Sequence, residues 1–360
     1  MRRRDFITRI AASAGTTYAV MQALDLIEKP ATAQKSPFQL QRRGGSKSII
    51  ILGAGLGGMT CAYELSKVGY QCKILEARER SGGRCWTVRT GDKFTDTLGQ
   101  TQTIGFDRGQ YFNPGPARIP YHHVTIDYCK ELGVPLEVIV NLSRQQYIYR
   151  ENAGSLSGRK VHFREAIADM RGYISELLAK AISKDAVDAP LTVEDKEKMI
   201  EFLRTYGGLN PDLFYKGSSR RGYSTYQGAG DAPGVVDDPY DLSALLELGF
   251  AGNESFEFGF NQQMTMFEPV GGMDAIAKAF EKQVGRFITY GAVVTEIRKT
   301  PNGVQILYKD KSGNVKQETA DYCICNIPLS VLKDIPSDFA PDMKEAIASV
   351  EYAVTGKSAL

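Results

Sequence analysis

Three glycines and one acid are spaced as in sites that hold a dinucleotide. The glycines are Gly53, Gly55 and Gly58, and Glu76 follows eighteen residues after the last of them. Gly53 permits a tight turn, Gly55 lets the backbone approach a pyrophosphate, and Gly58 allows a helix to pack closely against a strand. Glu76 is placed to accept hydrogen bonds from a ribose hydroxyl. The glycines alone could form an ordinary turn, so the secondary structure predicted around them must show whether the turn binds a dinucleotide.

The elements predicted around these residues make the pattern specific. Residues 47–52 contain a continuous apolar run typical of a buried parallel strand, and residues 59–68 have apolar side chains at helical spacing. Residues 71–75 predict a second strand, which ends at Glu76. A strand, a glycine turn, a helix, a strand and an acid in this order predict a Rossmann-like α/β unit with a pyrophosphate at the helix N-terminus.

A second glycine-rich segment, at residues 76–84, favours a flavin over a nicotinamide cofactor. Its sequence is Glu-Ala-Arg-Glu-Arg-Ser-Gly-Gly-Arg, which resembles the first FAD segment of the flavin-containing amine oxidase family. The resemblance implies that FAD is bound, beside the three glycines, by Glu76, Ala77, Arg78, Gly83 and Arg84. In the family the two arginines lie along the pyrophosphate and flavin side of the cofactor. A solvated basic loop is the alternative for them.

A third segment, at residues 113–120, resembles the L-amino-acid oxidase branch of the same family. Its sequence is Asn-Pro-Gly-Pro-Ala-Arg-Ile-Pro. The resemblance implies that this loop runs beside the isoalloxazine and that its arginine holds the substrate carboxylate. The implied cofactor-binding residues are Gly115, Pro116, Ala117 and Arg118, and Arg118 is also the implied substrate-binding residue. A planar guanidinium suits that role because it binds a carboxylate through two parallel hydrogen bonds, although a structural arginine remains an alternative.

Two residues later in the chain each match a single functional position of the family. Val294 matches the residue whose backbone pairs with the adenine ring in relatives, and it could equally be a buried strand residue. Lys357 lies in a segment that looks like the one containing the family's catalytic lysine, which holds a water near flavin N5. A solvated lysine is the alternative there. Residues 267–274 also restore the family pattern, as a turn that feeds a helix at 274–284.

The family resemblance predicts an α/β fold: a Rossmann-like FAD-binding domain of the GR2 type, with a mixed-sheet substrate domain and a helical insertion. In relatives the chain continues into the substrate sheet and a last glycine-rich FAD segment, so we expect this chain to stop before the fold is complete. The predicted divisions are a signal peptide at 1–33, a linker at 34–46, FAD-binding parts at 47–120 and 263–335, a helical and substrate-binding region at 121–262, and the start of a truncated substrate domain at 336–360.

The remaining elements follow from periodicity and turn residues. Helical spacing predicts helices over 161–184 and 191–206, the second beginning with a capping box at 192–195. Residues 304–308 and 315–319 predict a hairpin, and residues 320–328 resemble the strand that returns into the FAD sheet. Five aromatic residues of the middle region could line a pocket, but core positions are favoured for them: Tyr223, Tyr226, Phe256, Phe258 and Phe260.

The first thirty-three residues resemble an export signal. Arg3-Arg4-Asp5-Phe6-Ile7 is similar to a twin-arginine motif, although Arg2 and Thr8 depart from the usual pattern. An uncharged run and a small-residue site at 31–33 complete the layout, and the run is too short to span a membrane. We therefore expect an exported protein, periplasmic or secreted. A short amphipathic helix is the alternative for this segment.

The composition excludes other classes of partner and site. The 44 Lys and Arg residues face 42 Asp and Glu residues, and residues 1–33 hold five of the bases and three of the acids. The rest of the chain is therefore neutral, so neither nucleic acid nor anionic lipid is an expected partner. With three histidines and no C-x-x-C among six cysteines, no metal site is predicted.

The resemblance implies the oxidation of an L-amino acid by FAD. Hydride would pass from the α-carbon to flavin N5, and molecular oxygen would reoxidise the flavin, giving a 2-oxo acid, ammonia and hydrogen peroxide. An amine or a polyamine is the alternative substrate, and a non-catalytic FAD-binding fragment or subunit is the alternative from another class. The expected partners are a small amino acid or amine and oxygen, and a homodimer stays open.

Overall fold

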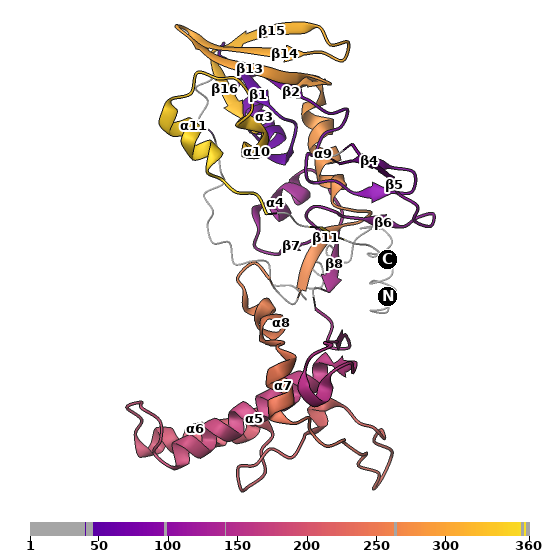
Figure 1. The fold of residues 1–360 in the computed structure, drawn as a ribbon, viewed down its shortest axis with the longest axis vertical. Helices are drawn as coiled ribbons and strands as arrows, with labels where there is room; N and C mark the ends of the chain where they lie inside the picture. The colour runs from indigo at the N-terminus through magenta and orange to yellow at the C-terminus, as the bar shows by residue number, and fades with distance from the viewer. Residues whose placement is uncertain are drawn as a thin grey trace, which may run out of the picture. The chain divides into compact units, whose positions relative to one another are not determined.

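The computed structural model describes residues 40, 46–96, 99–140, 142–262, 265–353 and 356–357 (Figure 1). The predicted signal peptide at 1–33 lies outside them. Contacts divide the chain into a first unit, residues 1–139 with 265–360, and a second unit, residues 140–264. Among the described residues no helix combines the length and the apolar character needed to cross a membrane.

A four-stranded parallel sheet forms the centre of the first unit. Its order is β12-β2-β1-β16, so β1 lies between β2 and β16. Ile51 of β1 pairs with Ile74 on one side and with Ile324 on the other. The two predicted strands of the glycine pattern and the predicted return strand are thereby confirmed. The strands are β1 Ser48–Leu52, β2 Gln71–Glu76, β12 Ile288–Tyr290 and β16 Tyr322–Cys325.

The sheet is covered on both faces, which explains why β1 is continuously apolar. Ile49 and Ile51 belong to one buried cluster, which contains residues of α3 and α9. Ile50 and Leu52 belong to the cluster on the opposite face, with residues of β13 and β14. These flanking layers are helices α3 Leu56–Lys67 and α9 Asp274–Val284 and the antiparallel strands β13 Val293–Thr300, β14 Gly303–Lys309 and β15 Val315–Ala320 (Figure 1).

Short strands tie the loops of the first unit together. Helix α4, Val124–Glu131, packs its Ile126 and Cys129 into the cluster that also contains residues of α3 and α9. The paired strands are β3 Val88–Arg89 with β6 Tyr111–Phe112, β4 Lys93–Thr95 with β5 Thr101–Thr103, and the sheet of β7 Ile119–Pro120, β11 Thr265–Pro269 and β8 Leu136–Val140. The helices are α4 Val124–Glu131, α10 Leu329–Leu332, α11 Pro341–Ala348 and the 3-10 helix Gly285–Phe287.

Helices dominate the second unit. The capping box predicted for its second helix, α6 Val193–Gly207, is present, because the side chains of Thr192 and Asp195 accept hydrogen bonds from each other's backbone N–H groups. Gly208 caps the C-terminal end of α6 with a φ of 68°. The helices are α5 Phe163–Ser183, α6 Val193–Gly207, α7 Leu242–Leu248, α8 Ala251–Ser255 and the 3-10 helices Gly154–Leu156, Ser219–Arg221 and Phe256–Phe258. Strands β9 Tyr147–Ile148 and β10 Val161–His162 pair beside them.

A buried ion pair joins α5 to the loop that follows α6. The Asp169 carboxylate is fully buried and lies 2.7 Å from Nε of Arg221. It also accepts hydrogen bonds from the Tyr215 hydroxyl at 2.7 Å and from the Tyr240 backbone N–H at 2.9 Å. Four polar groups from three segments therefore meet at one buried carboxylate inside this unit.

The expectation that the aromatic residues of the middle region form core is wrong for four of them. Tyr226, Phe258 and Phe260 are 84%, 83% and 78% exposed, and Phe256 is 37% exposed. Tyr226 lies in a loop, Phe256 and Phe258 lie in a 3-10 turn, and Phe260 follows that turn. Tyr223 is half-buried instead. Residue type favoured burial, but the irregular backbone at these positions presents the rings to solvent.

Candidate cofactor and substrate site

The glycine turn, residues 53–58, connects β1 to α3. Gly53 has a φ of 101°, which favours glycine, and its N–H donates to the Leu75 carbonyl at 2.8 Å. A β-carbon on Gly58 would lie 2.1 Å from the Gly53 carbonyl oxygen, so a glycine is required for α3 to begin this close to β1. No side chain caps the first turn of α3 and no acid lies in it. Its N–H groups can therefore receive an anion.

Glu76 ends β2 beside this turn and is 7% exposed. One carboxylate oxygen accepts the Ala54 N–H at 2.7 Å, and the other accepts the Arg78 N–H at 2.9 Å. Two backbone donors thus fix the orientation of the carboxylate. Because each carboxylate oxygen can accept a second bond, the group remains able to bind a hydroxyl. The turn and the acid together fit the pyrophosphate and a ribose of a dinucleotide.

The diglycine turn, residues 82–84, lies against the glycine turn. The Gly82 N–H donates to the Ala54 carbonyl at 2.8 Å, and a β-carbon on Gly83 would lie 3.3 Å from the α-carbon of Gly55. Arg80 was not among the predicted site residues. Its guanidinium donates to the Gly83 carbonyl at 2.8 Å and lies over the Trp86 ring, 4.4 Å from the ring centre.

The exposed residues of this segment face solvent from a fixed backbone. Ala77, Arg78 and Arg84 are exposed, so their side chains are accessible to a ligand. Arg80 is half-buried, and burial together with the neighbouring Arg78 lowers its pKa. Arg80 therefore braces the turn, whereas Arg78 and Arg84 are the arginines that a cofactor can reach.

The arginine loop, residues 113–118, packs directly on the diglycine turn. A β-carbon on Gly115 would lie 2.0 Å from the carbonyl oxygen of Arg84, which allows only glycine at this contact. The buried Asn113 side chain holds the loop, because its Oδ1 accepts the Thr87 hydroxyl at 2.7 Å and the Met273 N–H at 3.1 Å. Neither Asn113 nor Thr87 was predicted as a site residue, and no local pattern distinguishes them.

Arg118 projects from the end of this loop. Its side chain is exposed, while the next residue, Ile119, is buried in β7 and pairs with Phe267 of β11. The backbone is therefore anchored immediately after Arg118. Pro116 is exposed and Ala117 is half-buried on the same loop.

Lys357 approaches the arginine loop from the far end of the chain. Its Nζ donates to the Asn113 carbonyl at 3.2 Å and also to the Gly115 carbonyl. An ammonium group has three N–H donors, so one remains for another acceptor. The structure thus brings the predicted lysine and the loop of the predicted arginine together.

Val294 lies near the acid at the end of β2. Ala292, two residues before it, donates its N–H to the Glu76 carbonyl at 2.8 Å. Val294 itself is half-buried, opposite Tyr308 of β14, and packs on the cluster that covers this face of the sheet. Val294 therefore lies on the strand that begins beside Glu76, and it is also a strand residue of the core.

Two buried thiols near the site are unsuited to nucleophilic chemistry at neutral pH. Burial raises the pKa of Cys85 to about 11 and that of Cys129 to about 12. Both therefore stay protonated, as small core residues do.

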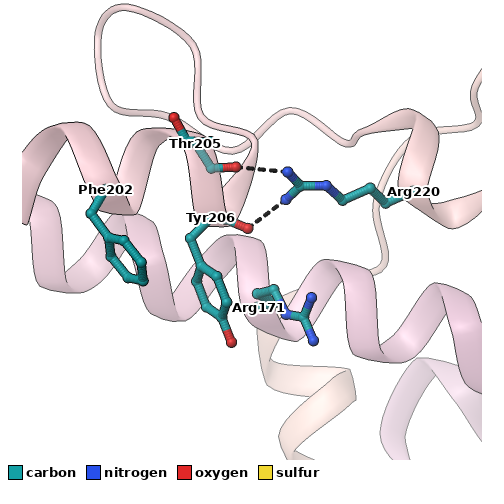
Figure 2. A pocket seen from close by; sticks show the side chains of 5 residues that line it. All are labelled: Arg171, Phe202, Thr205, Tyr206 and Arg220. Carbon is teal, nitrogen blue, oxygen red and sulfur yellow. Dashed lines mark hydrogen bonds between the residues drawn. The ribbon is translucent and has the colours of Figure 1, made fainter. Parts of the chain in front are cut away.

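Two cavities of the second unit contain none of the predicted site residues. Figure 2 shows one of about 390 Å³, lined by Arg171, Phe202, Thr205, Tyr206 and Arg220. There the Arg220 guanidinium donates to the Thr205 carbonyl at 2.7 Å and to the Tyr206 carbonyl. These bonds close the C-terminal end of α6, so this arginine has a structural role.

Known proteins with similar sequences include several L-amino-acid oxidases. A protein of Bacillus subtilis (strain 168) provisionally named as an L-amino-acid oxidase, YobN, is 27% identical over 318 residues, which cover 85% of this chain and 61% of that protein. The L-amino-acid oxidase of Demansia vestigiata is 25% identical over 87% of this chain and 57% of its own length. That of Daboia russelii is 26% identical over 87% and 58%.

The chain thus spans about three fifths of the length of the curated relatives that it matches. A family model described as flavin containing amine oxidoreductase matches residues 56–360, which is most of the sequence. That match begins inside the glycine turn and includes the diglycine turn, the arginine loop and Lys357. The protein therefore belongs to the flavin-containing amine oxidoreductase family, whose cofactor is FAD.

Proposed function

We propose that this protein functions as an FAD-dependent L-amino-acid oxidase, which converts an L-amino acid to a 2-oxo acid, ammonia and hydrogen peroxide. One observation supports this most: a series of contacts, each involving the backbone of a turn or loop, joins four motifs. The glycine turn contacts the diglycine turn, the diglycine turn contacts the arginine loop at Gly115, and that loop binds Lys357. These contacts support the proposal that the glycine turn, Glu76 and the diglycine turn form a cradle for the dinucleotide in the same framework as Arg118.

In this proposal the cradle holds FAD by several kinds of contact. Gly53 makes the tight turn, the pyrophosphate takes the N–H groups at Gly55 and Gly58, and Glu76 accepts a ribose hydroxyl. Arg78 and Arg84 add charge along the pyrophosphate and flavin side, and Val294 meets the adenine. Ala77, Gly83, Gly115, Pro116 and Ala117 complete the lining. When bound, FAD supplies the two-electron oxidant that takes hydride from the substrate α-carbon and passes the electrons to oxygen.

The protein's own contribution is position and charge. The Arg118 guanidinium binds the substrate carboxylate through two parallel hydrogen bonds, which fixes the α-carbon in one orientation. Two carbonyls, of Asn113 and Gly115, orient the Lys357 ammonium. Its third N–H holds a water in the site. Export by a twin-arginine-like signal belongs to the same proposal, because that route transports proteins already loaded with cofactor.

The test is an Arg118→Ala substitution in the natural, flavin-loaded protein. Loss of one partner of the charge pair is expected to cost about 2–5 kcal/mol in kcat/KM for the amino acid. Arg108→Ala is the matched control, because Arg108 is an exposed arginine in a nearby turn of the same unit. Unchanged kcat/KM in Arg118→Ala would contradict the carboxylate role.

An amine or polyamine is the second candidate substrate, which the family description favours as much. Turnover of an amino acid and of its decarboxylated amine separates the two, because only the first gives Arg118 a carboxylate. If the amine is the better substrate and Arg118→Ala leaves its turnover unchanged, the protein is an amine oxidase. The intact mass of the naturally produced protein, measured together with its flavin absorbance, separates both enzymes from a non-catalytic FAD-binding fragment.

A further inference from the structure

The strand on the other side of β1 ends at the glycine turn as well. β16 pairs with β1 up to Leu52 and Cys325, and the next residue, Asn326, donates its N–H to the Leu52 carbonyl at 2.9 Å. Glu76 is the last residue of β2 on one side of β1, and Asn326 is the first residue after β16 on the other side. Two polar side chains therefore flank the turn from the two neighbouring strands.

The Asn326 side chain lies over the glycine turn. Its Nδ2 lies 3.3 Å from the position of a β-carbon on Gly55, and its Oδ1 lies 3.0 Å from that of a β-carbon on Gly57. The Asn326 carbonyl oxygen lies 3.3 Å from the corresponding position on Gly53. The side-chain amide thus lies beside Gly55 and Gly57, and the backbone carbonyl of the same residue lies beside Gly53.

The backbone of Asn326 is fixed, whereas its side-chain amide is accessible. The Asn326 N–H is bonded to the Leu52 carbonyl of β1, and no hydrogen bond of the side-chain amide is found among the described residues. The residue is exposed, so solvent satisfies the amide in the absence of a ligand. A structural asparagine would instead bond a neighbouring turn, as Asn113 does.

The chemistry of the two flanking side chains differs in the way that a dinucleotide requires. The Glu76 carboxylate only accepts hydrogen bonds and repels a phosphate, so it suits a ribose hydroxyl. The Asn326 amide has two N–H donors and no charge, so it suits a phosphoryl oxygen. The turn between them supplies backbone N–H groups to the same anion.

We propose that Asn326 is a further cofactor-positioning residue, whose Nδ2 donates to a pyrophosphate oxygen of FAD. It closes the phosphate site from the β16 side, opposite the acid on the β2 side. This inference rests on FAD as the cofactor of the family and not on the substrate proposed above.

The experiment measures cofactor affinity of the flavin-free chain. Asn326→Ala removes the donor, and Asn326→Asp replaces it by a carboxylate of the same shape that repels phosphate. Asn302→Asp is the matched control, because it makes the same chemical change in the exposed turn between β13 and β14. FAD binding is followed by quenching of flavin fluorescence, ADP and AMP are tested as competitors, and thermal unfolding of each flavin-free variant checks its fold.

The dissociation constant for FAD should rise about tenfold or more in Asn326→Ala, the usual loss for a hydrogen bond to a charged group. It should rise further in Asn326→Asp. ADP, which contains a pyrophosphate, should lose affinity by a similar factor, and AMP should lose less. Asn302→Asp should bind FAD like the wild type, and all flavin-free variants should unfold at similar temperatures.

Wild-type affinity for FAD in Asn326→Asp overturns the proposal and leaves the FAD assignment intact. An equal loss of AMP and ADP affinity also overturns it, because the contact would then not be to the pyrophosphate. Failure of the wild-type chain itself to bind FAD or ADP contradicts the cradle as a whole.

Discussion

The two units use buried polar groups and glycines for different purposes. In the first unit, Glu76 and Asn113 accept N–H groups of turns, and glycines bring backbone against backbone, as Gly115 does at Arg84. In the second, Asp169 and Arg221 form a buried ion pair, and glycines make room for side chains. The first arrangement fixes loops around a surface that faces solvent. The second fixes helices against one another.

The glycines of the second unit show the contrast in detail. A β-carbon on Gly172 would lie 2.3 Å from the Tyr215 ring, and one on Gly207 would lie 2.3 Å from the Ser175 β-carbon. Both positions allow close packing around α5 and α6, and neither lies beside an exposed arginine loop. The same residue type is therefore a packing device in one unit and part of a ligand cradle in the other.

Breaking the buried ion pair should give the largest effect. In Asp169→Ala, Arg221 keeps its buried charge without a counter-ion and two further donors lose their acceptor, so the second unit should lose about 3–5 kcal/mol. Hydrogen exchange of α5 reports this loss. The only tryptophan, Trp86, lies in the first unit, so its fluorescence should stay unchanged.

The control for this variant is Glu201→Ala, which removes an exposed pair with Arg204 and should change stability by less than about 1 kcal/mol. Equal protection of α5 in Asp169→Ala and the wild type would refute the structural role of the pair. A parallel loss of FAD affinity would refute the division of labour between the units.

A methyl group in the glycine turn should act on the first unit alone. Gly58→Ala places a β-carbon 2.1 Å from a backbone oxygen, so α3 must shift, at a cost of about 1–3 kcal/mol. FAD affinity should fall with it, as titration of flavin fluorescence would show. Gly105→Ala is the control, because nothing lies within 4 Å of its β-carbon position. Normal FAD binding in Gly58→Ala would show that the turn is not the cradle.

The smallest effect concerns acid stability of the first unit. Burial alone would raise the pKa of Asp274, but hydrogen bonds from Arg89 and Lys278 outweigh it, and the pKa lies below its ordinary value. Its contribution to stability is therefore complete above the pKa of the unfolded chain, and it is lost as pH falls through the lower, folded pKa.

In Asp274→Asn, the free energy of unfolding should therefore fall less than in the wild type when the pH is lowered from about 5 to about 3. Urea unfolding followed by Trp86 fluorescence measures this in the first unit. Asp107→Asn, at an exposed aspartate of the same unit, is the control. An unchanged pH dependence in Asp274→Asn would remove this pair from the acid response.

Local elements were predictable because their causes are local. The apolar run of β1, the helix after the glycines and the capping box at Thr192 each depend on neighbouring residues, and the structure confirms them. The exposure of Tyr226 and Phe258 was not predictable, because aromatic residues usually pack inside and only the path of the backbone brings these to the surface.

The sequence by itself determined the order of strand, turn and helix around Gly53, Gly55 and Gly58, since period and glycine placement act over a few residues. Only the tertiary structure decided that Arg84 meets Gly115, that Lys357 binds the loop of Asn113, and that Asn326 covers the turn. These contacts join segments far apart in the chain, at distances that depend on how the layers of the sheet and helices pack. Spacing along the sequence contains no record of them.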